Sequence, residues 1–419
     1  MRIVSRVAWC AAGVLWLVPS GTHAQASPSL ALTLAAARDS ARRQSPELLA
    51  MKHAVAAAAG RNRQANAWPN PTLSYGREQT SLEGESNSQD ILSLDQPVEL
   101  GGQRGARRAS ARSGYDAAEA RLAATAARID YEVARSYAAA VAARRRAELA
   151  AAAAAAFDRA AGVSRARLAA GDVSGYQHRR LALEAARYSA LHVEALMARD
   201  SALRSLTSMI GLPSDVSSIA LTDTLVPQPL AVPADSLVAL AMTGRPELRA
   251  ASMEAEAGAA EARLARAERV PTPILTGGYK HERLAGGISL GGFVAGVTLP
   301  LPLWDHRGGA VEAARAEAAR REAEVEVVRR QTAREVRTAF EVHQALAEQL
   351  RLVYEQLGDD AAKARRAAET AYAEGEIGLL EWLDSVRAYQ EAETTYVTVW
   401  AEYIARRAAL ERATGAKLF

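Results

Sequence analysis

The sequence predicts a mainly α-helical protein with a small β part, built from two copies of one unit. Ala, Arg, Glu and Leu are abundant and only 5% of the 419 residues are aromatic, a composition typical of long helices. Two long stretches, Tyr115–Ala161 and Ala310–Leu357, contain neither Gly nor Pro. Short segments of alternating apolar and polar residues precede each stretch, and motifs of the first half recur about 200 residues later.

The charge balance argues against two other classes of protein. The chain has 51 Lys and Arg residues against 48 Asp and Glu, and 49% of its residues are hydrophobic. A disordered chain would have fewer apolar residues and a larger net charge than +3. A nucleic-acid-binding protein would gather its basic residues in a patch, whereas here acidic residues accompany them along the chain.

The first residues have the layout of a secretory signal peptide. Arg2 and Arg6 precede an apolar run, Val7–Val18, and small residues follow it. We expect residues 1–24 to be removed by cleavage after Ala24, with Ala26 as the alternative site. A membrane anchor is the other interpretation, but about a dozen apolar residues are too few, because roughly 20 are needed to span a bilayer.

The single cysteine, Cys10, lies within this apolar run. Its loss with the signal peptide would leave a mature chain without a disulfide, a thiolate metal site or a cysteine nucleophile. No later stretch offers 18 consecutive apolar residues, so we expect no transmembrane helix. Any part that enters a membrane would have to do so as β-strands.

An internal duplication is the strongest feature of the sequence, because five pairs of motifs recur in the same order. They are Ser45–Leu48 with Arg245–Leu248, Trp68–Pro71 with Val270–Pro273, Gln96–Leu100 with Leu299–Leu303, Ala170–Val173 with Glu374–Ile377, and Ile210–Gly211 with Thr414–Gly415. The separations run from 200 residues, for Pro46 and Pro246, to 204, for Gly211 and Gly415. We therefore predict a tandem repeat.

We expect a first repeat over residues 25–212, a linker rich in Pro and Ser over 213–233, and a second repeat over 234–419. Each repeat has the same predicted plan: a first helix, a β-hairpin, a long helix, a Gly-containing turn and a return helix. The first helices are expected at 32–64 and 236–268, each with a break at its Pro. The strands are expected at 72–78, 91–96, 274–280 and 293–299, with hairpin loops at 79–89 and 281–292.

The number of strands predicts an oligomer. Four strands are too few to close a barrel, for which about eight are needed. Two chains would give eight strands and little lumen, whereas three chains would give twelve and an aqueous pore. Tyr75, Tyr279 and Phe293 are candidate aromatics for the interfaces of a thin outer membrane. The helices are too polar for lipid and would continue the barrel as an aqueous tube.

The duplicated plan resembles the TolC-like outer-membrane efflux factors over essentially the whole mature chain. Three motifs, Asn70–Leu73, Gln96–Arg104 and Leu299–Asp305, resemble the cobalt-zinc-cadmium resistance (CzcC-like) branch. The resemblance implies a trimeric channel-tunnel, in which each protomer gives four strands to a twelve-strand outer-membrane β-barrel and long helices to a periplasmic α-barrel. It also implies a homotrimer in contact with outer-membrane lipid, a periplasmic membrane-fusion adaptor and a proton-driven inner-membrane pump of the RND type.

In this family the turns at the ends of the long helix pairs meet the adaptor. The resemblance places this docking tip at eight residues: Gly171, Asp172, Val173, Gly175, Gly375, Ile377, Gly378 and Leu379. Turns rich in Gly expose backbone and small side chains, so another helical hairpin can pack against them closely. The alternative is that these are ordinary helix C-cap glycines.

Two acidic residues follow the second turn. Glu381 and Asp384 are three residues apart and lie on one helix face. By resemblance they point into the tunnel constriction, where three copies would form a ring of carboxylates that attracts cations. The alternative is a solvated helix face. The first repeat has a basic stretch, Gln177–Arg180, at the matching place, and we expect that it could pair with these carboxylates and hold the tip closed.

No residues suggest catalysis, a cofactor or a metal site, so we expect a conduit and not an enzyme. Phosphate loops and nucleophile elbows are absent from the sequence. The mature histidines have no second His or Cys at ligand spacing, and we interpret them as solvated or loop residues: His53, His178, His192, His281, His306 and His343. The resemblance of the strand-end motifs to the metal-resistance branch implies export of divalent heavy-metal cations. The alternatives are a conduit for drugs, polysaccharide or type I secretion, and a periplasmic structural coiled-coil protein.

Overall fold

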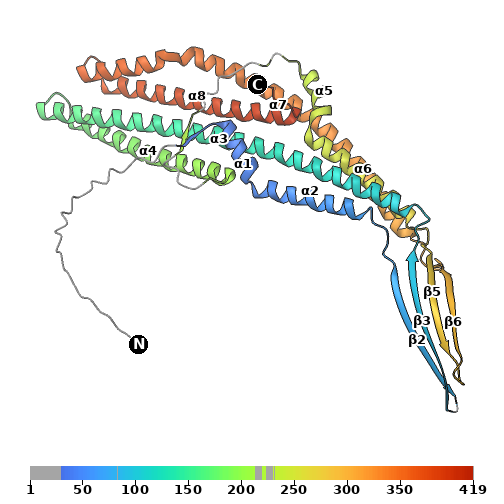
Figure 1. Ribbon diagram of the computed structural model, residues 1–419. Helices are drawn as coiled ribbons and strands as arrows, with labels where there is room; N and C mark the ends of the chain where they lie inside the picture. Colours follow the sequence, from blue (N-terminus) through green and yellow to red (C-terminus); the bar gives the residue numbers. More distant parts are fainter. Residues whose placement is uncertain (1–29, 83, 213–218, 223–229, 231, 419) are drawn as a thin grey trace, which may run out of the picture.

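The structure is a computed structural model that describes residues 30–82, 84–212, 219–222, 230 and 232–418. The predicted signal peptide and most of the predicted linker lie outside these residues. Long helices form most of the molecule, and a narrow sheet of four strands extends from one end of the helical part (Figure 1). Within the described ranges, none of the helices has an apolar stretch long enough to cross a membrane.

The two halves of the chain repeat one order of elements. The first half has α1 (Leu34–Gln44), α2 (Pro46–Gln64), β2 (Thr72–Leu82), β3 (Glu85–Pro97), α3 (Gln103–Ala170) and α4 (Gly175–Ile210). The second half has α5 (Ala234–Gly244), α6 (Pro246–Ala267), β5 (Ile274–Arg283), β6 (Ser289–Thr298), α7 (Gly308–Glu374) and α8 (Leu379–Thr414). Two short strands, β1 (Leu30–Leu32) and β4 (Ile219–Leu221), pair in parallel beside the helices.

The first helix of each half is divided where the sequence places a proline. Ser45 caps α2, its side chain accepting a hydrogen bond from the Leu48 amide at 3.4 Å, and Pro46 occupies the first helical turn, where a missing N–H costs nothing. In the second half Arg245 and Pro246 take the same places, although Arg245 provides no side-chain cap. The predicted breaks therefore separate α1 from α2 and α5 from α6.

The long helices α3 and α7 connect the sheet to the far end of the bundle. They contain 68 and 67 residues, which corresponds to roughly 100 Å each at about 1.5 Å per residue. The buried face of α3 is rich in Ala, so neighbouring helices approach it closely. Larger side chains fill the core where α1 and α4 cover α3. There the hydroxyl of the fully buried Tyr137 donates to the Leu32 carbonyl at 2.9 Å.

The four long strands form one antiparallel sheet in the order β2-β3-β5-β6. The predicted hairpin loops at 79–89 and 281–292 are wrong, because most of these residues belong to strands. Pairing between β2 and β3 continues to Leu82 opposite Glu85, and pairing between β5 and β6 continues to Arg283 opposite Ser289. The hairpin ladder satisfies the backbone hydrogen bonds there, although the side chains of 79–89 do not alternate between apolar and polar.

Candidate functional site

The predicted docking turns lie together at the end of the bundle that is farthest from the sheet (Figure 1). Gly171 ends α3 with φ 83° and Gly375 ends α7 with φ 87°, a left-handed conformation that favours glycine. In both turns the amide after the glycine donates to the carbonyl five residues earlier, at 2.9 and 2.8 Å. This is the Schellman arrangement, and it satisfies carbonyl groups left open at a helix C-terminus.

Arg167 of the first half links the two turns. Its Nη2 donates to the Ala373 carbonyl at 2.9 Å, and its guanidinium lies 5.8 Å from the centre of the Tyr372 ring. A methyl group placed on Gly375 would lie 3.1 Å from the same Nη2 atom. The tip of α3 is therefore held against the tip of α7 within one chain.

The starts of the return helices differ. Ser174 and Gln177 form a capping box on α4, in which the Ser174 hydroxyl accepts from the Gln177 amide at 3.2 Å and the Gln177 side chain accepts from the Ser174 amide at 3.0 Å. Gly378 occupies the N-cap position of α8 and has no side chain to cap the helix. Of the other predicted docking residues, Asp172 is exposed and Ile377 is half-buried against the cluster described next.

An aromatic cluster lies directly behind the turns, and we call it the tip cluster. It joins Phe157 of α3, Tyr188 of α4, Tyr372 of α7, and Trp382 and Leu383 of α8. The Trp382 ring stacks on Tyr372 at 5.1 Å between centroids and meets Phe157 edge-on at 4.9 Å. Trp382 is 1% exposed, and burial raises the pKa of Tyr372. All four helices of the tip thus share one core.

Sequence reasoning missed this cluster. Its members come from four helices, and no local pattern connects them. One local pattern could have indicated it: Trp382 and Leu383 lie between Glu381 and Asp384 in the sequence. On a helix, this pattern predicts that the apolar pair faces the core and the two carboxylates face outward.

The predicted constriction residues occupy that exposed face of α8. Glu381 and Asp384 are both exposed, and neither forms an ion pair within the described part of the chain. The predicted pairing with Gln177–Arg180 does not form within one chain: His178 Nδ1 lies 3.4 Å from the Ser164 hydroxyl, on the α3 side. A different ion pair joins α4 to α8, between Glu184 and Arg387 at 2.6 Å. Both carboxylates therefore remain available to ions or to another chain.

The histidines of the described residues do not form a metal site with other ligands. In the ranges that the structure covers, no group of three or more His, Cys, Asp or Glu side chains could hold a metal ion. His343 corrects the interpretation of the histidines as solvated or loop residues, because it lies on the buried stripe of α7 with 0% exposure. Its ring packs 4.9 Å from Tyr403, and burial, followed by the charge of Arg407, lowers its pKa.

In its half nearer the helices, the sheet has one apolar face and one more polar face. The registers place eight large apolar side chains on the first face: Leu73, Tyr75, Leu92, Leu94, Leu275, Tyr279, Phe293 and Val297. All of them are exposed, from 48% for Leu275 and Tyr279 to 92% for Phe293. On the polar face Asp95 accepts hydrogen bonds from Ser74 at 3.2 Å and from Thr276 at 2.5 Å, and this side of β3 is the more sheltered one. The pattern is the reverse of a sheet that folds in water.

The apolar face continues past the end of β6 toward the helices. Leu299, Leu301, Leu303 and Trp304 are 52%, 66%, 63% and 92% exposed. From Phe293 to Leu299 the chain advances roughly 20 Å at about 3.3 Å per residue. Together with Trp304, this length approaches the apolar band of about 25 Å in outer-membrane proteins.

Comparison with known proteins places the chain in a family. The family model for outer membrane efflux proteins matches residues 37–212 and 237–416. The chain belongs to this family. The family places it in the outer membrane with a part that extends into the periplasm, as the sequence predicts, and this excludes the alternative of a periplasmic structural coiled coil.

Two relatives of known function are similar in sequence. The chain is 28% identical over 289 residues to the nickel-cobalt-cadmium resistance protein NccC of Alcaligenes xylosoxydans xylosoxydans, a match covering 68% of this chain and 64% of NccC. It is also 28% identical over 323 residues to the nickel and cobalt resistance protein CnrC of Cupriavidus metallidurans, covering 75% of this chain and 73% of CnrC. The match thus spans slightly less than two thirds of NccC.

Solved structures share the fold at low sequence identity. The outer membrane protein VceC of Vibrio cholerae is 20% identical with a TM-score of 0.73, over 92% of this chain and 97% of VceC. The CmeC outer membrane channel of Campylobacter jejuni is 16% identical with a TM-score of 0.75, over 92% of this chain and 86% of CmeC. The predicted fold class, mainly helical with a small sheet, is confirmed.

Proposed function

We propose that this protein is the outer-membrane conduit of a tripartite efflux system that exports divalent heavy-metal cations. The observation that carries the proposal is the sheet, whose apolar face is exposed while the polar face of its two central strands, β3 and β5, is more sheltered. Such a sheet is stable when lipid covers the first face and water fills the space behind the second. The choice of metal cations rests on the two resistance proteins that the sequence resembles.

The open edges of the sheet support a trimer. Strands β2 and β6 have 11 and 10 residues, and each pairs with one neighbour within the described chain. A long edge strand in a membrane leaves backbone groups without hydrogen bonds, so β6 of one protomer would pair with β2 of the next. Three protomers would close a twelve-strand barrel, and Glu78, Asp95 and Glu282 on its inner face would favour cations.

The tip would provide the contact with a periplasmic membrane-fusion adaptor, which in turn would connect to an inner-membrane pump of the RND type. Its docking residues are those of the two turns, Gly171 to Gly175 and Gly375 to Leu379. The paired tips expose backbone at their Gly residues and rest on the tip cluster, so they form a firm, narrow end. We assign Glu381 and Asp384 to the tunnel constriction, where their lack of partners leaves them free to attract passing cations.

The first experiment tests the conduit and its docking end. The protein would be purified in detergent, its mass measured, and its conductance recorded in planar bilayers. In parallel, cells lacking the gene, with and without a plasmid copy, are tested for growth on nickel, cobalt, cadmium and zinc. We expect a trimer that conducts and restores metal resistance. A monomer, or a trimer without conductance, would exclude the conduit. Restored resistance to drugs without resistance to metals would replace the metal substrate by the alternative one.

Gly375→Trp should form conducting trimers but abolish metal export, because the new ring meets Arg167 and blocks the docking surface. Gly286→Trp is the matched control: Gly286 also has a positive φ, 84°, but lies in the hairpin turn at the other end of the molecule. Export by Gly375→Trp equal to that of the control would exclude docking at this turn.

The double variant Glu381→Gln, Asp384→Asn tests the constriction. Removal of the carboxylates should lower the preference of the channel for cations over anions, measured as a reversal potential in a salt gradient. Glu391→Gln, an exposed change on the same helix, is the control. An unchanged reversal potential in the double variant would assign both carboxylates to an ordinary solvated face.

A further inference from the structure

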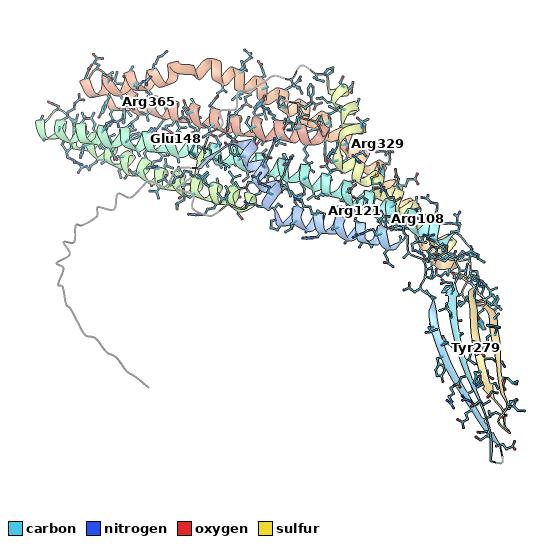
Figure 2. The ribbon with its side chains drawn as sticks, viewed as in Figure 1. Arg108, Arg121, Glu148, Tyr279, Arg329 and Arg365 are labelled. Atoms are coloured by element: carbon cyan, nitrogen blue, oxygen red, sulfur yellow. The ribbon has the colours of Figure 1, made fainter. Side chains whose placement is uncertain are left out.

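A row of aromatic side chains crosses the apolar face of the sheet. Tyr75, Leu92, Tyr279 and Phe293 lie side by side on the four strands, and the Tyr279 and Phe293 rings meet edge-on at 6.0 Å. Figure 2 shows Tyr279 about midway between the helices and the hairpin turns. Tyr279 leans toward the turns, where its hydroxyl lies over Gly291, and any side chain at Gly291 would collide with it.

The next row toward the hairpin turns is charged. Arg77, Asp90 and His281 lie side by side there on the same face, and Arg283 follows one row farther. Apolar side chains thus give way to charged ones within a single row. The cluster contains two guanidinium groups but one carboxylate, and it is displayed on the outside of the sheet.

The guanidinium groups are available for another ligand. Asp90 accepts a hydrogen bond from the Tyr75 hydroxyl at 2.8 Å, whereas its distances to Arg77 and Arg283 are 3.8 and 4.0 Å. These two distances are longer than an N–H···O hydrogen bond. The two arginine side chains are 51% and 57% exposed, against 24% for Asp90. Asp90 therefore positions the two cations without using their hydrogen-bonding capacity, and Arg77 additionally interacts with the Tyr75 hydroxyl.

We propose that Arg77 and Arg283 bind the phosphate groups of an anionic glycolipid in the outer leaflet of the membrane. The proposal rests on the proposed function, because that function sets the orientation: with the helices in the periplasm, the hairpin turns face the cell exterior. Aromatic rows mark the membrane interface, so the row just beyond them lies at the level of the headgroups. Two guanidinium groups on one face suit phosphate oxygens, which they bind through paired, charge-assisted hydrogen bonds.

The opposite face of the sheet has a different charge at the same level. Glu78 and Glu282 lie there, and Lys280 is paired with Glu282 at 3.4 Å. Phosphate would be repelled on that face and attracted on the outer one. Lys280 thus provides a control, since its replacement also removes one positive charge next to His281 but on the inner face.

The test uses the full-length mature trimer in detergent, with bisphosphorylated lipid A as the probe and native mass spectrometry to measure bound lipid. Wild type and Lys280→Gln should bind lipid A equally. The double variant Arg77→Gln, Arg283→Gln should bind it with an affinity at least about tenfold lower, as expected when charged hydrogen bonds are lost. The double variant Arg77→Lys, Arg283→Lys keeps the charge and should retain part of the binding.

Phosphatidylglycerol and inorganic phosphate separate the possible sources of the anion. Lipid A that binds in preference to both supports the proposal; equal binding of inorganic phosphate, or loss of binding in Lys280→Gln as well, overturns it. Trimer mass and bilayer conductance are measured on the same samples. Trimers that conduct but bind no lipid A overturn this inference alone, whereas absence of trimers or of conductance refutes the proposed function.

Discussion

The first and second halves of the chain share a backbone at the tip but differ in the side chains built on it. Both turns use a left-handed glycine, and the residues that follow match at a separation of 204 positions. Gln177 of the first half uses its side chain to cap its own helix, whereas its counterpart Glu381 has no such task. The comparison teaches that glycine sets the shape of the turn, and that the second half supplies the exposed carboxylates at the start of the return helix.

A second difference lies in the middle of the long helices. Tyr137 and Phe340 match at a separation of 203 residues, as do Ala140 and His343. Ala140 and His343 are both fully buried. The first half therefore buries an apolar methyl group at a place where the second half buries an ionisable ring.

The largest expected effect comes from the tip cluster, which the two halves build jointly. Trp382→Ala should lower the free energy of unfolding by about 3 to 5 kcal/mol, because it empties the centre of the cluster. Denaturant unfolding of the purified protein checks this, with Leu380→Ala as the control, since Leu380 is 58% exposed on the same turn of helix. Equal losses in the two variants would show that the cluster does not hold the halves together.

Trp382→Phe should cost much less than Trp382→Ala. The indole Nε1 is buried without a hydrogen-bond partner in the described structure, so the phenyl ring gives up no polar contact there. We expect a loss of about 1 to 2 kcal/mol, because the smaller phenyl ring still fills most of the site but leaves part of it empty.

The two turn glycines should respond unequally to alanine. Each substitution forces a side chain into the left-handed region at a cost of about 1 to 2 kcal/mol. Gly375→Ala should cost more than Gly171→Ala, because its methyl group presses on Arg167, while nothing lies near Gly171. Unfolding free energies measured side by side would contradict the asymmetry if the order were reversed or the two losses were equal.

The buried ring of His343 should make stability depend on pH. Because burial lowers its pKa below the ordinary value of 6.5, the unfolded chain binds a proton more readily than the folded one. The stability is thus complete above about pH 6.5 and decreases as the pH falls through the range between 6.5 and the lower folded pKa. Unfolding midpoints between pH 8 and pH 5 would test this.

His343→Gln should flatten this pH dependence, whereas His53→Gln, at an exposed position of α2, should leave it unchanged. The slope is compared, so a constant loss of stability in His343→Gln does not disturb the test. A slope that persists in His343→Gln would assign the pH dependence to other groups.

The smallest effects concern the helix caps. Ser174→Ala should lower the stability by about 1 kcal/mol, because the Gln177 amide loses its acceptor. Gly378→Ser should raise it by a few tenths of a kcal/mol, since it gives α8 the cap that α4 already has. A loss of stability in Gly378→Ser would contradict this expectation and would mean that the second turn requires glycine at this position.

Much of the fold could be predicted from local signals. Pro46 and Pro246 predicted that the first helix of each half is divided, and Gly171 and Gly375 predicted where the long helices α3 and α7 end. Proline and glycine allow this because each constrains or frees its own backbone. The outer parts of the hairpins were missed, since residues 79–89 are polar on both faces and carry no period of two. Their strand structure depends on the partner strand, which a single segment does not reveal.

The candidate site was predicted in part. Its turns and its exposed carboxylates could be named, because glycine and charge are readable in one segment. The Arg167 contact with Ala373 and the Glu184–Arg387 ion pair could not, since each joins residues that are more than 200 positions apart. His343 was misjudged because histidine is polar, although its spacing from Phe340 places it on the apolar stripe of α7.

The uninterrupted length of α3 and α7 fixes how far the protein reaches. Both helices begin beside the sheet and end at the tip, with 68 and 67 residues and no break between. Residues inserted into one of them alone would shift its turn past the other and separate Arg167 from Ala373. A longer or shorter reach from the sheet to the tip would therefore require concerted changes in both halves, in steps of whole helical turns. The distance between the sheet and the tip is, in this sense, encoded twice in the chain.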